Sequence, residues 1–161
     1  MSKVPEVTLG FWIIKVLATT LGETGGDTVT MTLNWGYLAG AVLFGVALVV
    51  FVVAQISAKR FHAFLYWATI VASTTFGTAM ADFADRSLGI GYAGGSSLLL
   101  LSLGAALGLW YWSQGTVSVN TVSAPKTEAF YWATITLSQT LAQLLAIGSP
   151  TRATLATNAA R

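Results

Sequence analysis

The sequence predicts an all-α protein, a polytopic bundle of about five transmembrane helices that forms one membrane domain over residues 1–161. Three observations support this prediction. Hydrophobic residues make up 55% of the chain and charged residues only 9%, against about 25% charged in a typical soluble domain. Five apolar stretches approach the length of about 20 residues that crosses a bilayer. The chain also contains an internal repeat of two such stretches.

The composition also excludes several classes of function. With so few polar groups, a soluble enzyme of 16.9 kDa could not cover its own surface. The net charge of +2 is too small for a polybasic patch, so we expect the lipid bilayer and no nucleic acid as a partner. The chain has no cysteine and its one histidine is His62, which excludes cysteine-based catalysis and multi-histidine zinc sites within one chain.

The first apolar stretch, Val7–Gly22, contains one basic residue, Lys15. A signal peptide is the alternative interpretation, because it would also lie at this end of the chain. A signal peptide has an uninterrupted apolar stretch followed by a small-residue cleavage site. Lys15 interrupts the stretch and no such site follows, so the sequence favours a transmembrane helix.

Four further stretches complete the predicted bundle. They are Gly36–Gln55, Phe64–Ala81, Ser96–Trp112 and Ala129–Gly148. The glycine pairs at residues 25–26 and 94–95 are expected in the loops between them. Within the fourth stretch, Gly104 and Gly108 form a GxxxG motif, which predicts a close helix contact or a homo-oligomer.

The basic residues predict the orientation of the chain, because loops rich in lysine and arginine stay in the cytoplasm. Four of them lie before the first stretch, between the second and third, or between the fourth and fifth: Lys3, Lys59, Arg60 and Lys126. The segments on the opposite side of the membrane contain one basic residue, Arg86. The N-terminus is therefore predicted to be cytoplasmic, and the acidic ends of the first and third stretches face outward.

The chain repeats itself with a shift of 55 residues. Under this shift Trp12 matches Trp67, Asp27 matches Asp82, and the Gly-Tyr pair at 36–37 matches the pair at 91–92. The string YWATI at residues 66–70 returns 65 residues later, at 131–135. We place the repeats at about residues 5–58, 60–115 and, in part, 125–141. Two spans per unit give successive units the same orientation, so the repeats are predicted to be parallel.

The third copy stops matching after Leu141, where the chain continues AQLLAIGSPTRATLATNAAR. One added G before a permitted coding of these residues gives GTALGDWVADTGNLGYERGA. That string restores the glycine, the aspartate and the Gly-Tyr pair of the repeat. Residues 142–161 are therefore predicted to be a frameshifted tail on a truncated member of a longer family. The alternative is a genuine short protein with a divergent end.

Two strings, KVPEVTLGFWIIKVLATTLGETGGD and YWATIVASTTFGTAMADFADRSLGIGY, are distinctive. They resemble a bacterial family of multi-pass inner-membrane proteins that are usually labelled only "membrane protein" or "membrane-anchored protein". The resemblance covers roughly Lys3 to Leu141. It implies a location in the inner (plasma) membrane and implies no mechanism.

The candidate functional residues are carboxylates at the outer ends of two equivalent helices. Glu23 and Asp27 are spaced i,i+4, and Asp82 and Asp85 are spaced i,i+3, so each pair lies on one helical face. Ionisable groups in membrane segments are costly and indicate a functional site. If the repeats pack around a common axis, we expect the four carboxylates to converge.

The residue types suggest which ligand such a site would take. Carboxylate and hydroxyl oxygens suit Mg²⁺, Mn²⁺ or Ca²⁺, and a proton relay is equally compatible; no resident cofactor is expected. The hydroxyls expected along the route are Thr19, Thr20, Thr74 and Thr75. Lys15 lies two turns before Glu23 with Thr19 between them. It is either a counter-ion for Glu23, a competitor for a transported cation, or a snorkelling side chain.

The leading hypothesis is a transporter or channel for a hard cation or protons. The alternative is a non-catalytic membrane scaffold that binds a partner through its helix faces. In that case the acidic residues would only be helix-terminal residues in contact with water, and Arg86 would form a surface ion pair with Asp85. The sequence shows no nucleophile paired with a base, so we expect no enzymatic activity.

Overall fold

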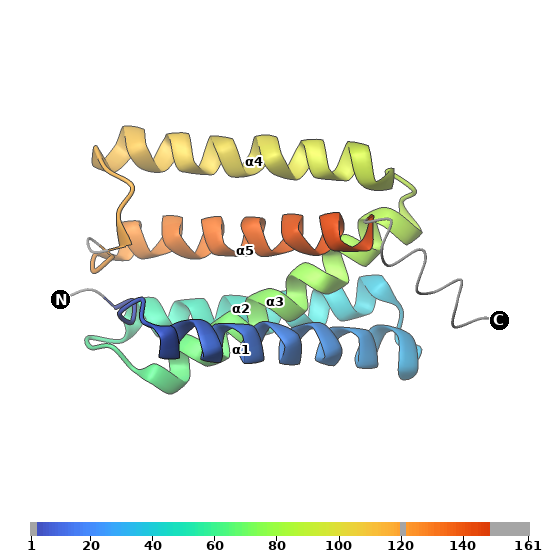
Figure 1. Ribbon diagram of the computed structural model, residues 1–161, viewed down its shortest axis with the longest axis horizontal. Coiled ribbons are helices and arrows are strands. Elements are labelled where there is room, and N and C mark those ends of the chain that lie inside the picture. Colours follow the sequence, from blue (N-terminus) through green and yellow to red (C-terminus); the bar gives the residue numbers. More distant parts are fainter. Residues whose placement is uncertain (1–2, 120–121, 149–161) are drawn as a thin grey trace.

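The computed structural model describes residues 3–119 and 122–148, and this part of the chain forms five helices (Figure 1). They are α1 (Leu9–Asp27), α2 (Tyr37–Ser57), α3 (Ala63–Asp82), α4 (Gly91–Gln114) and α5 (Pro125–Ile147). The predicted all-α fold of five helices is confirmed. α5 continues past Leu141, and the remainder of the predicted frameshifted tail, residues 149–161, lies outside the described residues.

Local signals in the sequence set several helix ends. Thr8 caps α1, where its side-chain oxygen accepts a hydrogen bond from the backbone N–H of Phe11 at 3.3 Å. Pro125 begins α5, a position where its missing N–H removes no helical hydrogen bond. Gly115 ends α4 in the left-handed conformation, with φ of +71°.

The helices of successive repeats run in the same direction. Figure 1 shows that α1, α3 and α5 begin at one end of the bundle, where α2 and α4 end. α3 crosses the bundle obliquely and packs against α1, α2 and α5, whereas α4 packs mainly against α5. The α1–α3 contact thus has a counterpart in the α3–α5 contact, and the α2–α3 contact in the α4–α5 contact.

Individual residues repeat this correspondence. The rings of Phe11 and Trp67 lie 5.4 Å apart between α1 and α3, and those of Tyr66 and Trp132 lie 5.5 Å apart between α3 and α5. The two contacts correspond under the repeat, because Phe11 matches Tyr66 by the shift of 55 and Trp67 matches Trp132 by the shift of 65. α5 therefore takes the position expected of the first helix of a third repeat.

The turn after the first helix is also the same in both complete repeats. α1 and α3 continue into π-helical turns, η1 (Thr28–Thr32) and η2 (Phe83–Ser87). Asn34 and Gly89, which are 55 residues apart, then take φ of +55° and +63°. Gly36 and Gly91 follow with φ of +82° and +72°, a region that favours glycine, which explains the glycine of the repeated Gly-Tyr pair.

The glycine pairs expected in loops lie instead within α1 and α4, so that prediction was wrong. Gly26 is buried against α3, where an added Cβ would lie 3.4 Å from the carbonyl oxygen of Thr75. An added Cβ at Gly95 would lie 2.6 Å from Leu144 Cδ2. These glycines allow close helix packing, which outweighs their low helix propensity.

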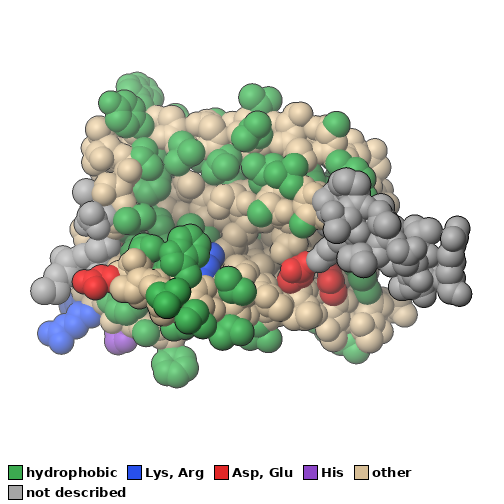
Figure 2. All heavy atoms as spheres, in the orientation of Figure 1, with side chains coloured by type: hydrophobic (Ala, Val, Ile, Leu, Met, Phe, Trp, Pro, Cys, Tyr) green, Lys and Arg blue, Asp and Glu red, His purple; other side chains and the backbone are tan. Residues whose placement is uncertain are grey.

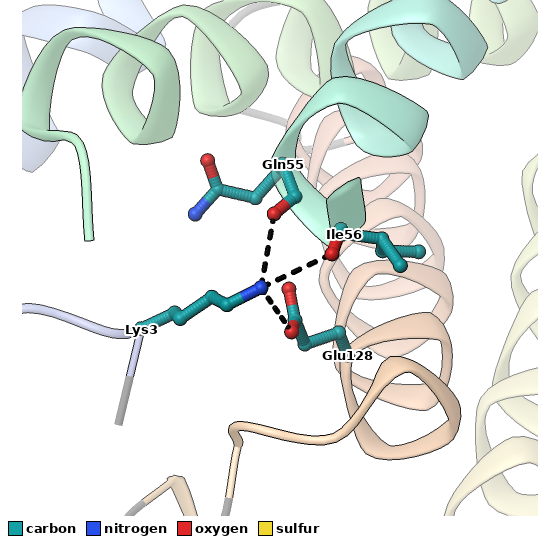
Figure 3. Close-up of polar contacts among 4 residues, drawn as sticks. All are labelled: Lys3, Gln55, Ile56 and Glu128. Carbon is teal, nitrogen blue, oxygen red and sulfur yellow. Dashed lines mark hydrogen bonds and ion pairs between the residues drawn. The ribbon is translucent and has the colours of Figure 1, made fainter. Parts of the chain in front are cut away.

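A buried ion pair of Lys3 and Glu128 connects the N-terminal segment to two helices at one end of the bundle (Figure 3). Lys3 Nζ lies 2.7 Å from Glu128 Oε1 and donates to the carbonyl oxygens of Gln55 at 3.3 Å and Ile56 at 3.1 Å. These carbonyls are at the negative end of α2, and Glu128 is in the first turn of α5. Both side chains are buried, with exposed fractions of 10% and 1%, so Lys3 joins the ends of α2 and α5.

Two of the helices, α2 and α4, are long and apolar enough to cross a membrane. Only 17% and 11% of the residues in their apolar windows are buried inside the structure. Their apolar side chains therefore face outward, unlike those of a core helix in a soluble protein.

Candidate functional site

A cleft of about 510 Å³ lies between α1 and α5, and α3 forms part of its wall. Figure 2 shows this face of the bundle, with acidic and basic side chains beside the hollow. Five predicted residues line the cleft: Lys15, Thr19, Thr20, Glu23 and Thr74. The other lining residues are Ile135, Ser138, Gln139, Ala142, Gln143 and Ala146.

Three of the lining residues occupy the same position in the three repeats. Thr19 matches Thr74 by the shift of 55, and Thr74 matches Gln139 by the shift of 65. Each comes from a different helix, α1, α3 or α5, and all three border one cleft. Gln139 was not among the predicted site residues, although the alignment of the repeats pairs it with Thr74.

The amide of Gln139 contacts two hydroxyl groups of α3. Ser73 Oγ and Thr74 Oγ1 each lie 2.8 Å from Gln139 Oε1, and they also lie 2.8 and 3.0 Å from the carbonyl oxygen of Ile70. The side chain of Gln139 is only 9% exposed. No acceptor for Gln139 Nε2 is found among residues 3–119 and 122–148. Gln139 Nε2 is itself fully buried, so the amide forms part of the cleft wall without offering its nitrogen to the open space.

The threonine hydroxyls are bound to their own helices. Thr19 Oγ1 donates to the carbonyl oxygen of Lys15 at 2.9 Å, and Thr74 Oγ1 also lies 3.0 Å from the carbonyl oxygen of Ile70. Such local bonds are common for threonine within helices. Because a hydroxyl has one proton, these groups mainly offer lone pairs to a ligand.

Asp82 has a different environment from Glu23. It is only 2% exposed and accepts a hydrogen bond from Arg86 Nε at 3.1 Å. The Arg86 guanidinium also lies over the ring of Tyr37 in α2, 5.9 Å from its centroid. Burial alone would lower the pKa of Arg86, but the hydrogen bond of Asp82 and the nearby charges, that of Asp85 included, raise it. The i,i+4 spacing gives Arg86 its ion pair with Asp82, and Asp85, the expected surface partner, acts on it through its charge.

The four predicted carboxylates do not form one metal site. In the described ranges, no three histidine or acidic side chains lie close enough together to hold a metal ion. Glu23 borders the cleft near α5, whereas Arg86 holds Asp82 on the side of α2; Asp27 ends α1 and Asp85 lies in η2. The expected convergence of all four acids on a divalent cation was therefore wrong.

A protein-family model described as "Repeat of Unknown Function (DUF347)" matches residues 10–61 and again residues 65–116. These ranges agree with the first two repeats found in the sequence. No curated protein matches the chain. No solved structure matches it either.

Proposed function

Because this chain belongs to the DUF347 family, whose repeats have no known function, we propose a function from the geometry of its cleft. We infer that the protein is a multi-pass transporter of the bacterial inner membrane that moves protons through the cleft between α1, α3 and α5. The observation that supports this most is the meeting of Thr19, Thr74 and Gln139, which are equivalent in the repeats, beside the carboxylate of Glu23.

The exposed apolar surface supports a membrane location. Five valines of α2 are each 56–61% exposed: Val42, Val46, Val49, Val50 and Val53. A soluble protein rarely exposes such a continuous apolar surface. In the described part of the chain, Lys3, Lys59 and Arg60 lie at the end where α1, α3 and α5 begin and Arg86 lies at the opposite end, which favours a cytoplasmic N-terminus.

The side chains in the cleft suit protons better than divalent cations. Mg²⁺ and Ca²⁺ require six or more oxygen ligands, several of them usually from carboxylates. Among the lining residues of this cleft the one carboxylate is that of Glu23, and Lys15 adds a positive charge. The carboxyl group of Glu23 can carry a proton, whereas the positive charge of Lys15 in the same cleft would repel a metal cation.

Replacing Glu23 with glutamine is expected to lower proton flux at least tenfold. Glutamine has nearly the same shape as glutamate but cannot carry the proton. The measurement uses proteoliposomes that contain a pH-sensitive dye, with a potassium gradient and valinomycin to drive protons inward. The control is Glu6→Gln, which makes the same change at an exposed position before α1.

A proton flux that falls in Glu23→Gln and is unchanged in Glu6→Gln supports proton transport through the cleft. If Glu23→Gln and the unchanged protein conduct equally, or neither exceeds protein-free vesicles, the proposal is wrong.

We further propose that α4 forms a contact between two copies of the chain through Gly104 and Gly108. Both glycines face away from the bundle, and an added Cβ would meet no atom of the described chain within 4 Å. Replacing both with leucine is expected to remove the dimer in chemical cross-linking of membranes, without lowering the thermal stability of the monomer. An equal yield of cross-linked dimer in the variant would contradict this contact.

A further inference from the structure

We propose that a groove between α2 and α3 binds a phosphatidylethanolamine molecule, with an acyl chain in the groove and the headgroup on Arg86 and Asp85. This inference goes beyond proton transport and rests only on the membrane location proposed above. The groove shares no lining residue with the cleft between α1, α3 and α5. The evidence is an apolar groove with a pair of opposite charges at one end.

The groove has a volume of about 450 Å³, and its lining residues are all apolar side chains or glycine. Gly45 keeps the space over α3 open, because an added Cβ there would lie 3.1 Å from Phe76 Cε2. The matching residue of the second repeat is Leu100, so α4 lacks this glycine. A groove without polar groups suits a hydrocarbon chain, which loses no hydrogen bond on entering it.

The groove has about the length of one lipid leaflet. Its lining residues on α2 run from Leu38 to Val50, a stretch of helix about 18 Å long at 1.5 Å per residue. One leaflet is about 15 Å of a hydrocarbon core of about 30 Å. An acyl chain that enters at Leu38 and follows the groove therefore ends near the middle of the membrane. This entrance is the end at which α2 begins, and α2 contacts η2.

Arg86 lies at the entrance of the groove. Tyr37, Ala41 and Gly45 are spaced i,i+4 on one face of α2, and the last two line the groove. The Arg86 guanidinium lies over the Tyr37 ring, 5.9 Å from its centroid. Its Nε donates to Asp82, but its two terminal nitrogens have no partner in the described part of the chain. Because the Arg86 side chain is 49% exposed, a phosphate can approach these nitrogens from outside the bundle.

The charges at the entrance favour a zwitterionic headgroup over an anionic one. Asp82 and Asp85 oppose the single positive charge of Arg86, so the net charge repels an anionic lipid. Asp85 is half-buried in η2, and its carboxylate has no ion pair or hydrogen bond within residues 3–119 and 122–148. A primary ammonium can donate to this carboxylate while the phosphate binds Arg86, whereas a quaternary ammonium has no N–H to donate.

Native mass spectrometry of the full chain in detergent tests this inference. The purified protein is titrated with phosphatidylethanolamine, phosphatidylcholine and phosphatidylglycerol, all with oleoyl chains. We expect phosphatidylethanolamine to bind at least fivefold more tightly than either of the other lipids. Phosphoethanolamine, which has the headgroup without the acyl chains, is expected not to displace the lipid at an equal concentration.

Two pairs of variants locate the acyl chain and the phosphate. Val46→Trp fills the groove and is expected to weaken binding of phosphatidylethanolamine at least tenfold. Its control is Val53→Trp, because Val53 lies on α2 outside the groove and is 56% exposed, against 60% for Val46. Arg86→Gln is expected to weaken binding of phosphatidylethanolamine and phosphatidylcholine alike, with Arg60→Gln as the control at an exposed position of the opposite end.

Asp85→Asn tests the ammonium contact and leaves the pair of Arg86 with Asp82 intact. This variant therefore tests the headgroup site even if Arg86→Gln fails to fold. The preference for phosphatidylethanolamine over phosphatidylcholine is expected to fall to less than twofold in Asp85→Asn and to stay unchanged in Glu6→Gln, an exposed acid at the other end.

The outcomes separate this inference from its alternatives. Equal binding of the three lipids, or an equal loss in Val46→Trp and Val53→Trp, would overturn it. Displacement of the lipid by phosphoethanolamine would show that the groove contributes nothing, and a cross-linked dimer lost in Val46→Trp would show that a second copy covers it. Either result would also overturn the lipid site. Selective lipid binding in a protein that conducts no protons supports this inference, and only the transport proposal then fails.

Discussion

Replacing Lys3 with methionine is expected to lower the free energy of unfolding by about 3–5 kcal/mol, the range observed when one partner of a buried ion pair is removed. The carboxylate of Glu128 is 1% exposed and lies in the first turn of α5. Its second oxygen has no hydrogen-bond partner in the described ranges, so Lys3 is its main source of neutralisation.

The reverse change is expected to have a smaller effect. In Glu128→Gln the Lys3 ammonium keeps the carbonyl oxygens of Gln55 and Ile56, so the remaining charge still has hydrogen-bond acceptors. Replacing Lys3 with methionine and Glu128 with leucine together is expected to restore most of the stability, because a buried ion pair often contributes little more than an apolar pair.

The measurement is equilibrium unfolding of the purified protein in a mild detergent, with the four proteins of a double-mutant cycle. Lys59→Met is the matched control, since it removes the same charge from an exposed position at the same end of the bundle. A loss in Lys3→Met no larger than that in Lys59→Met would show that the pair contributes no stability.

Replacing Gly22 with valine is expected to force α1 away from α3 and to destabilise the bundle by at least about 1–3 kcal/mol, as overpacked cores do. An added Cβ would lie 2.8 Å from Thr74 Cβ and 2.9 Å from the carbonyl oxygen of Val71. A backbone carbonyl cannot rotate away as a side chain can, so the whole helix must shift. Thr74 also lines the cleft, so the shift would alter the candidate site.

Gly25 provides a matched control on the same helix, because an added Cβ there meets no described atom within 4 Å. Gly25→Val has the same effect on helix propensity as Gly22→Val but produces no clash. Thermal melting followed by circular dichroism in detergent compares the two variants. Equal melting temperatures would mean that the close approach of α1 to α3 does not determine stability.

Much of the fold could be predicted from hydrophobic stretches and the repeat. The observed helix bounds differed most from the predicted ones at the glycine pairs, which had been expected in loops. Gly26 and Gly95 are in helices because they face Thr75 and Leu144 of other helices, and a contact between helices cannot be read from local propensity. The π-helical turns also extend the helical backbone beyond the acidic residues, which the apolar stretches alone did not indicate.

The candidate site could be predicted only in part. The spacing of Lys15, Thr19 and Glu23 placed them on one stripe of α1, and the repeat added Thr74. Gln139 required knowledge that α5 packs on α3 as α3 packs on α1. The repeat also predicted Asp82 as a site residue. It lies away from the cleft because it binds Arg86, whose equivalent in the first copy is Met31.

The ion pair of Lys3 with Glu128 also imposes an order of events during synthesis. The two residues are separated by about 125 positions, so at about 5–20 residues per second the ribosome makes Glu128 roughly 6–25 s after Lys3. During this interval the Lys3 ammonium has no Glu128 carboxylate to pair with. It can be buried only when α5 has been made and has packed. Lys3 thus precedes all five described helices in the chain, yet it reaches its buried position only after the last of them has formed.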